Sequence, residues 1–297
     1  MSAPRGTEHR FGGDWTSEKL SILDGYLRAY TTALVKQNFK TGYIDAFAGS
    51  GYRTPSSEPF EGQTLLFSDA ELAEPESRRW LDGSARIALS ASPRFDKYIF
   101  IERSRRRCEE LESLKQEFPE LAGDIDIRHA DANETIRKIC DKNWRRHRAV
   151  LFLDPYDMQV EWTTIVSVAK TKAIDMFLLF PLGIGVNRLL TRDAEIPYGW
   201  RLRLDVLLGT TNWYDECYRF EAEQTLFAPT ERVVKASMHT IGRYFNDRLK
   251  TIFAAVAPEP RVLKNRTGCP LYLLCFAAGN PRGANIAVSI ANHLLTR

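Results

Sequence analysis

Apolar residues follow two different periodicities that alternate along most of the chain. Short apolar runs typical of β-strands occur at residues 43–47, 98–102, 124–131, 149–156, 174–180 and 271–278. The run at 149–156 is almost continuously apolar, as expected for a strand buried on both faces of a sheet. Several of the flanking segments, beginning with residues 16–36, carry apolar residues every three or four positions and therefore predict helices. This alternation predicts an α/β fold, a mostly parallel sheet with helices on both faces.

The pattern becomes helical between about Leu190 and Pro258. A long apolar stripe in this region predicts one core-facing helix with the residues Val234, Met238, Ile241, Phe245, Leu249, Ile252 and Val256. We therefore expect a single compact domain. Its three stretches are a Rossmann-like core with an N-terminal helix at residues 1–190, a helical insertion at 191–260 and a return to the core sheet at 261–297.

Acidic residues end or follow four of the predicted strands. They are Asp45, Glu102, Asp131 and Asp154. In an open α/β sheet the carboxyl ends of the strands face one crevice, in which ligands bind. An edge lined only by carboxylates is electrostatically unfavourable, so we expect a ligand with hydroxyl groups, amines or a positive charge. Glu102 is placed to accept hydrogen bonds from a ribose diol.

The stretch YIDAFAGSG, residues 43–51, places two glycines shortly after the first of these acids. Gly49 and Gly51 allow the main chain to approach a ligand closely. The dinucleotide fingerprint G-x-G-x-x-G is incomplete, because Thr54 occupies the place of its third glycine. An acid before the glycines also repels a pyrophosphate but suits a cation. The pattern therefore favours S-adenosylmethionine, which has an amino group, a sulfonium and a ribose, over NAD or ATP.

Over residues 43–180 these motifs resemble those of the class I S-adenosylmethionine-dependent methyltransferases. FAGSG, residues 47–51, resembles the F-x-G-x-G signature of the branch that methylates amino groups. The resemblance implies a cofactor site made of Asp45, Phe47, Gly49 and Gly51, with Glu102 for the ribose and Asp131 for the adenine edge.

Residues 154–156, DPY, lie where that branch carries its catalytic D-P-P-Y motif. By resemblance, the Asp154 side chain and the Pro155 carbonyl accept the hydrogens of an exocyclic amine on a DNA or RNA base. Tyr156 then stacks on the flipped base. The sequence departs from the motif, because it reads D-P-Y-D with Asp157 in the place of the aromatic residue. The alternative is that Asp154 and Pro155 form a strand-ending turn and that Asp157 caps the next helix.

Over its whole length the chain resembles the three-Cys-motif partner protein family. The segments that carry this resemblance are DWTSEKLSILDGYLRAY (14–30), YIDAFAGSG (43–51), FIER (100–103), FLDPYD (152–157) and GNPRGANI (279–286). The family is named for being encoded beside a radical-enzyme-like protein with a three-cysteine motif, so the resemblance implies such a protein as a partner. A second possible function is therefore a non-catalytic or ligand-binding partner protein with a methyltransferase-like fold. Lys19, in the first segment, either lines the cofactor site or pairs with Asp24, and we expect a surface position for it.

Composition and charge add few constraints. No apolar run approaches the ~18–20 residues needed to cross a bilayer, and the first 15 residues contain no apolar segment typical of a signal peptide. We therefore expect a cytoplasmic protein without a membrane partner. The five cysteines are scattered without a C-x-x-C pair, which argues against a zinc site. The net charge of +3 is weak, and basic clusters at 103–107, 144–148 and 261–266 belong either to a solvated surface or to a face that contacts phosphates.

Overall fold

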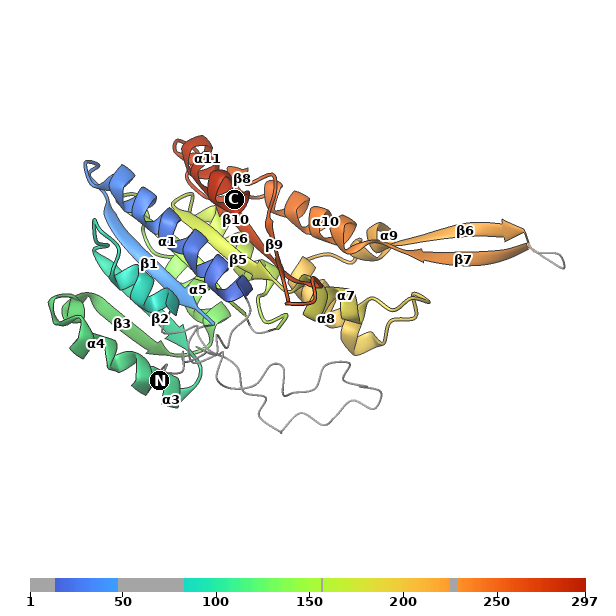
Figure 1. The fold of residues 1–297 in the computed structure, drawn as a ribbon, viewed down its shortest axis with the longest axis horizontal. Helices are drawn as coiled ribbons and strands as arrows, with labels where there is room; N and C mark the ends of the chain where they lie inside the picture. The colour runs from blue at the N-terminus through green and yellow to red at the C-terminus, as the bar shows by residue number, and fades with distance from the viewer. Residues whose placement is uncertain (1–13, 48–82, 156, 225–228) are drawn as a thin grey trace, which may run out of the picture.

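The computed structural model describes residues 14–47, 83–155, 157–224 and 229–297. Its centre is an eight-stranded sheet with the order β3-β2-β1-β4-β5-β10-β8, and β9 pairs with β10 off this path (Figure 1). The strands are β1 (Lys40–Ala46), β2 (Lys97–Glu102), β3 (Ile125–His129), β4 (His147–Leu153), β5 (Ile174–Phe180), β8 (Ala255–Val256), β9 (Arg261–Lys264) and β10 (Pro270–Ala278).

Strands β1 to β5 run parallel, whereas β10 runs antiparallel to both of its neighbours in the order, β5 and β8. A parallel sheet in the order 3-2-1-4-5, extended by an antiparallel strand, is a methyltransferase-like Rossmann fold. The predicted fold class is therefore confirmed. Each of the apolar runs singled out in the sequence corresponds to one strand of this sheet.

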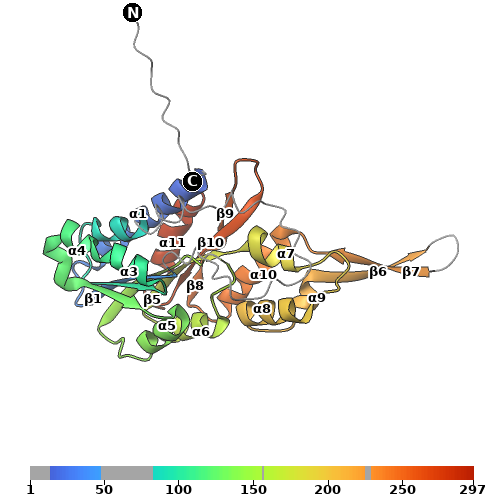
Figure 2. The ribbon, with the colours of Figure 1, turned by 90° about the horizontal axis from the view of Figure 1, so that it is seen from below.

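Helices cover both faces of the sheet (Figure 2). The helices are α1 (Asp14–Leu34), α3 (Arg105–Glu112), α4 (Leu114–Glu117), α5 (Ala132–Cys140), α6 (Trp162–Lys170), α7 (Asn187–Leu189), α8 (Tyr198–Leu208), α9 (Trp213–Cys217), α10 (Met238–Lys250) and α11 (Ala284–Leu295), with a 3-10 helix at Pro119–Asp124 and a π-helix at Leu182–Val186. Helices α1 and α11 pack against one face, and α5, α6 and α10 pack against the other. Within the described ranges, no helix combines the length and apolar character that a membrane span requires.

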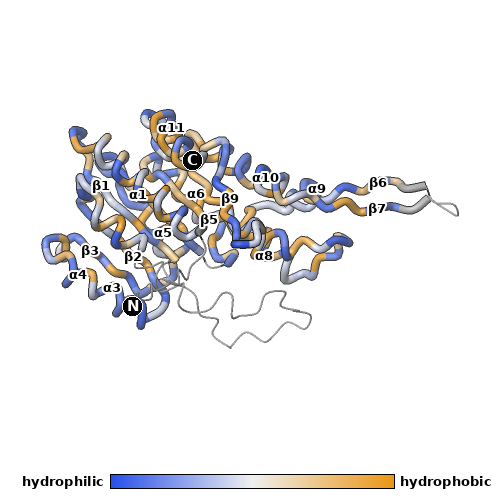
Figure 3. Tube along the Cα trace, in the orientation of Figure 1, coloured by the Kyte–Doolittle hydropathy of each residue, from blue (hydrophilic) through white to orange (hydrophobic). Residues whose placement is uncertain are grey.

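The sheet separates two apolar cores, because successive residues of a strand point to opposite faces. In β4, Leu151 and Leu153 pack with α5 and α6, whereas Val150 and Phe152 face α1 and α11. Strand β5 is buried along its whole length, and Figure 3 shows hydrophobic segments concentrated in the middle of the body. Burial on both faces explains the nearly continuous apolar runs in the sequence.

The insertion at residues 191–260 is only partly helical, which corrects the sequence-based prediction. Besides α8, α9 and α10 it contains a hairpin of β6 (Tyr218–Gln224) and β7 (Pro229–Lys235), which projects from the body as a two-stranded arm (Figures 1 and 2). The apolar stripe does not form one continuous helix, because Val234 lies in β7 and Val256 in β8. Ser237 begins α10 by accepting a hydrogen bond from the amide of Thr240. The apolar residues repeat at helical spacing on both sides of Ser237, so the sequence pattern did not indicate that a helix begins there.

Candidate functional site

The carboxyl edge of the parallel strands brings the predicted acids together. The register of β1 against β2 and β4 places Glu102 and Asp154 two residues beyond the positions opposite Asp45. Asp131 follows β3 and directly precedes α5. The four acids therefore lie at the same edge of the sheet.

Three of the predicted site residues, Gly49, Gly51 and Tyr156, lie outside the described residues. Phe47, just before the glycines, has a φ of 64°, which is uncommon for a residue with a side chain. Its ring is buried in the core on the α5 side of the sheet. The ring therefore packs in the hydrophobic core. We expect a ligand to contact the main chain of Phe47 and not its ring.

Lys19 is fully buried and forms an ion pair with Asp154, with 2.5 Å between Nζ and Oδ2. The surface position expected for Lys19 is therefore wrong, and Asp24 pairs instead with Arg28. Helical spacing explains this result, because Lys19 lies one turn after the buried Trp15 on the face of α1 that packs against the sheet.

Two aromatic rings lie near the buried ammonium group. Lys19 Nζ lies 5.5 Å from the ring centroid of Trp15 and 5.7 Å from that of Phe152. A cation near aromatic rings gains electrostatic attraction that offsets part of its desolvation. The ion pair and the rings together explain how a lysine is accommodated beneath the carboxyl edge.

Asp45 is buried beside this ion pair and is bound by hydroxyl groups. Tyr43 Oη donates to Asp45 Oδ2 at 2.9 Å, and the side chain of Ser84 provides a second hydrogen bond. Burial raises the pKa of Asp45 to about 7, and the neighbouring charge of Asp154 acts in the same direction. The hydrogen bonds and the charge of Lys19 oppose this rise.

Glu102 is the acid whose hydrogen bonding is incomplete. The side chain is only 2 % exposed, and its Oε1 accepts a hydrogen bond from the amide of Ser104 at 2.5 Å. Its Oε2 is also buried and forms no hydrogen bond with a described residue, although the amide of Arg103 and the guanidinium of Arg107 lie near the carboxyl group. Burial raises the pKa of Glu102, as expected for a carboxyl group withdrawn from water.

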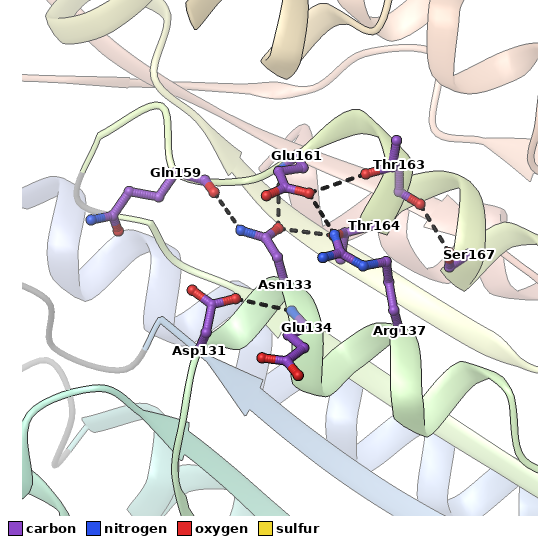
Figure 4. A network of polar contacts seen from close by, with 9 residues as sticks. All are labelled: Asp131, Asn133, Glu134, Arg137, Gln159, Glu161, Thr163, Thr164 and Ser167. Carbon is purple, nitrogen blue, oxygen red and sulfur yellow. Dashed lines mark hydrogen bonds and ion pairs between the residues drawn. The ribbon is translucent and has the colours of Figure 1, made fainter.

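Asp131 is exposed and begins α5. Its Oδ1 accepts a hydrogen bond from the amide of Glu134 at 2.9 Å, which makes Asp131 the N-cap of the helix (Figure 4). This contact fixes the carboxylate at the carboxyl edge, beside the end of β3.

A polar network ties the first turn of α5 to the segment after β4 (Figure 4). The side-chain amide of Asn133 donates to the carbonyl of Gln159 at 2.8 Å. Its oxygen accepts hydrogen bonds from the amide of Glu161 at 3.0 Å and the hydroxyl of Thr164 at 2.9 Å. Arg137 reinforces the connection by donating to the carboxylate of Glu161. The network fixes the chain that leads away from Asp154, and no sequence motif indicated it.

Asp157 does not cap the following helix, which corrects that alternative. Helix α6 begins at Trp162 with Glu161 in the N-cap position, and Asp157 forms an ion pair with Arg203 of α8. The helix starts too far along the chain for Asp157 to reach its first turn. The D-P-Y-D segment is instead connected to the insertion.

Most of the acids at this edge thus already have a hydrogen-bond or ion-pair partner within the protein. Lys19 supplies one positive charge, hydroxyl groups bind Asp45, and Asp131 binds the helix end. The edge is therefore less anionic than the sequence suggested, because Lys19 lies within it. The Oε2 atom of Glu102 still lacks a donor among the described residues.

The three basic clusters lie in different parts of the fold. Residues 103–107 follow β2 at the carboxyl edge, residues 144–148 include the first two residues of β4 at the opposite edge, and residues 261–266 include β9. Several of these arginines are also paired, Arg105 with Glu109, Arg106 with Glu110 and Arg261 with Glu18. The clusters therefore do not form one continuous basic face.

No protein-family model and no curated protein matches the chain. Similar solved structures include the protein LPL1258 of Legionella pneumophila, with a TM-score of 0.44, 12% identity and coverage of 96% of this chain and 93% of that protein. The spermidine synthase of Thermotoga maritima has a TM-score of 0.39 and 12% identity, covering 90% of this chain and 60% of the synthase. The putative methyltransferase yhhF of Escherichia coli has a TM-score of 0.29 and 13% identity, covering 72% and 86%.

Proposed function

We propose that the chain is an S-adenosylmethionine-dependent methyltransferase that acts on an exocyclic amino group of a DNA or RNA base. The observation that carries the proposal is the buried Oε2 atom of Glu102, which has no donor among the described residues. A buried carboxylate oxygen without a partner costs free energy, about 1–3 kcal/mol or more. A ribose hydroxyl at the carboxyl end of β2 would supply the missing donor.

The residues present fit this cofactor. We assign Glu102 to the ribose, Asp45 to the amino group of the cofactor and Asp131 to the adenine edge. Gly49 and Gly51 are assigned to the same site by their place in the sequence motif. When bound, S-adenosylmethionine supplies a methyl group on a sulfonium, which is a good leaving group.

Asp154 is the proposed acceptor for the substrate amine. Lys19 binds Oδ2 of Asp154 and so orients the carboxylate. We assign Oδ1 to one hydrogen of the amine and the carbonyl of Pro155 to the other, with Tyr156 stacking on the base. Holding both hydrogens keeps the nitrogen lone pair directed at the methyl group, and such orientation supplies much of the rate enhancement.

Calorimetry with S-adenosylmethionine tests the cofactor site. We expect the full chain to bind it, and Glu102→Gln to weaken binding about tenfold or more, because a charge-assisted hydrogen bond is lost. The matched control is Glu109→Gln, an exposed acid on the adjacent helix, which should leave the affinity unchanged. Folded wild-type protein that produces no binding heat would refute the proposal.

Transfer of a radiolabelled methyl group to DNA or RNA tests the reaction. Asp154→Asn keeps an oxygen for Lys19 but loses the charge, so we expect cofactor binding to persist and transfer to fall about 10- to 150-fold. Undiminished transfer by this variant would remove the role assigned to Asp154.

A second candidate is a partner protein without transferase activity. It is favoured by one observation, that both carboxylates of D-P-Y-D are already paired with cations of the chain, Asp154 with Lys19 and Asp157 with Arg203. In this proposal a three-Cys-motif protein encoded beside the chain is the partner, and the insertion provides the docking surface. We expect the two full-length proteins to co-purify. We expect this complex to be lost when residues 218–235 are replaced by a short Gly-Ser turn. Retention of the complex without the arm would contradict the docking assignment.

A further inference from the structure

A separate cavity lies at the opposite edge of the sheet, where the parallel strands begin. It has a volume of about 370 Å³, at the small end of the ~300–1,000 Å³ typical of ligand pockets. It is lined by the second half of α1, the beginning of α11 and the first residues of β4 and β5. Helices α1 and α11, far apart in sequence, pack side by side (Figure 1), and both contribute residues to its lining.

The walls of this cavity are mostly apolar. Leu34 of α1, Phe39 before β1, and Ile286 and Ile290 of α11 are among the lining residues. Ile286 is 64% exposed although it is a large aliphatic residue. The cavity therefore suits a compact ligand with an apolar body.

Two polar atoms in the lining are buried without a hydrogen-bond partner. They are the hydroxyl of Tyr30, whose side chain is only 8% exposed, and Nε of Arg148. Burial and the charge of Asp175 raise the pKa of the Tyr30 hydroxyl, and the charge of Arg148 acts in the opposite direction. Most buried polar groups in proteins find partners, so two such donors in the lining of one cavity point to an acceptor that a ligand would supply.

Asp175, which also lines the cavity, already accepts other hydrogen bonds. Asp175 accepts hydrogen bonds from the hydroxyl of Tyr26 at 2.9 Å and from the amide of Gly279 at 3.0 Å. No ion pair joins Asp175 to Arg148 within the part of the chain that the structure describes. Arg282 lies on the same side and adds a second positive charge.

The remaining contacts of Arg148 fix its orientation. Its guanidinium lies 3.9 Å from the ring centroid of Phe39, and Nη1 donates to the carbonyl of His147 at 2.7 Å. These contacts hold the guanidinium in place while Nε has no protein acceptor. A fixed guanidinium beside a hydroxyl donor matches the two oxygens of a carboxylate.

We propose that this cavity binds a small organic carboxylate with an aromatic or branched apolar body. One carboxylate oxygen accepts from Nε of Arg148 and the other from the hydroxyl of Tyr30, while the apolar body contacts Leu34, Ile286 and Ile290. Arg282 adds a favourable charge at the rim. The site is independent of the proposed methyl transfer, because it lies at the opposite end of the strands.

Phenylacetate is the probe for this site, and its neutral counterpart phenylacetamide is the comparison. We expect saturable binding of phenylacetate to the full chain in calorimetry or NMR titration, and binding of phenylacetamide at least about tenfold weaker. Tyr30→Phe and Arg148→Met should each weaken phenylacetate binding about tenfold or more, because each removes a bond to a charged group. Tyr30→Phe should leave thermal stability unchanged, since its hydroxyl has no partner to lose.

The matched control is Arg146→Met, which removes an exposed arginine of the same basic cluster outside the cavity and should leave the affinity unchanged. Failure of the wild-type chain to bind phenylacetate at 10 mM would overturn the proposal. Equal binding of acid and amide, or binding unaffected by Tyr30→Phe, would do the same.

Discussion

Nζ of Lys19 lies 2.5 Å from Oδ2 of Asp154, so the first helix is joined to the end of β4 by an ion pair whose cation is fully buried. The two residues are 135 positions apart in the chain. A lysine in this position contributes to stability only while its partner is charged or accepts a hydrogen bond.

Lys19→Met is therefore expected to lower the free energy of unfolding by about 3 kcal/mol, because it leaves Asp154 without its cation. The double variant with Asp154→Asn should recover part of this loss, since no charge is left unpaired. Urea denaturation measures both effects. Arg28→Met, which breaks an exposed pair on the same helix, should cost less than about 1 kcal/mol. Equal losses for the two helix positions would show that burial of the Lys19 pair does not matter.

Asp45 should make stability depend on pH. Burial raises its pKa from the ordinary value of 3.8 to about 7, so between these values the folded state binds more protons than the unfolded state. Its contribution is complete below about pH 4 and is lost as the pH rises through about 7. Asp45→Asn should remove a slope of up to about 1.4 kcal/mol per pH unit in denaturation curves recorded between pH 5 and pH 7. Asp175, with its pKa raised to about 6, should retain a similar slope in that variant below about pH 6 only.

Asn133→Ala should destabilise the chain by about 3 kcal/mol, because its side chain makes three hydrogen bonds worth about 1 kcal/mol each. The amides of residues 159–161 should also exchange faster with solvent, which hydrogen-exchange mass spectrometry detects. Ser167→Ala, which removes one exposed hydrogen bond in the same region, is the control and should change stability by less than about 1 kcal/mol. A small effect of Asn133→Ala would mean that the segment after β4 is held by other contacts.

Gly209 ends α8 with a φ of 65°, and a Cβ atom there would come within 2.0 Å of the Trp162 ring. Gly209→Ala should therefore cost about 3 kcal/mol or more, from the strained backbone and the clash together. Gly268 has a φ of 83° but open space around it, so Gly268→Ala should cost only about 1 kcal/mol. Thermal denaturation of the two variants separates the effect of the clash with Trp162 from that of backbone strain. Equal losses of stability would argue against the clash.

Much of the fold follows from local sequence pattern. The strands could be predicted because burial on both faces leaves apolar runs, and their parallel order follows from the helices between them. The gathering of Asp45, Glu102 and Asp154 could be predicted for the same reason, since strands that run parallel end at one edge. Such features follow from the spacing of apolar residues over a few positions, and this spacing can be read from a single sequence.

Contacts between distant segments could not be predicted in this way. Nothing near Lys19 indicates that Asp154 is its partner, and the more obvious candidate, Asp24, binds Arg28 instead. Asn133 lies in a helix that the sequence predicts well, yet its burial depends on residues of another loop. The hairpin was missed because the apolar positions of β7 continue those of α10 at a spacing that also suits a helix.

The insertion leaves the sheet after β5, at the border where the acids gather, and returns through β8, which pairs with Ala277 and Ala278 near the opposite border. The residues assigned to the cofactor and to the substrate amine therefore lie in the core, whereas the arm belongs to a separate stretch of chain. The arm and its supporting helices could then lengthen, shorten or change partners during evolution while the acids at the strand ends stay as they are.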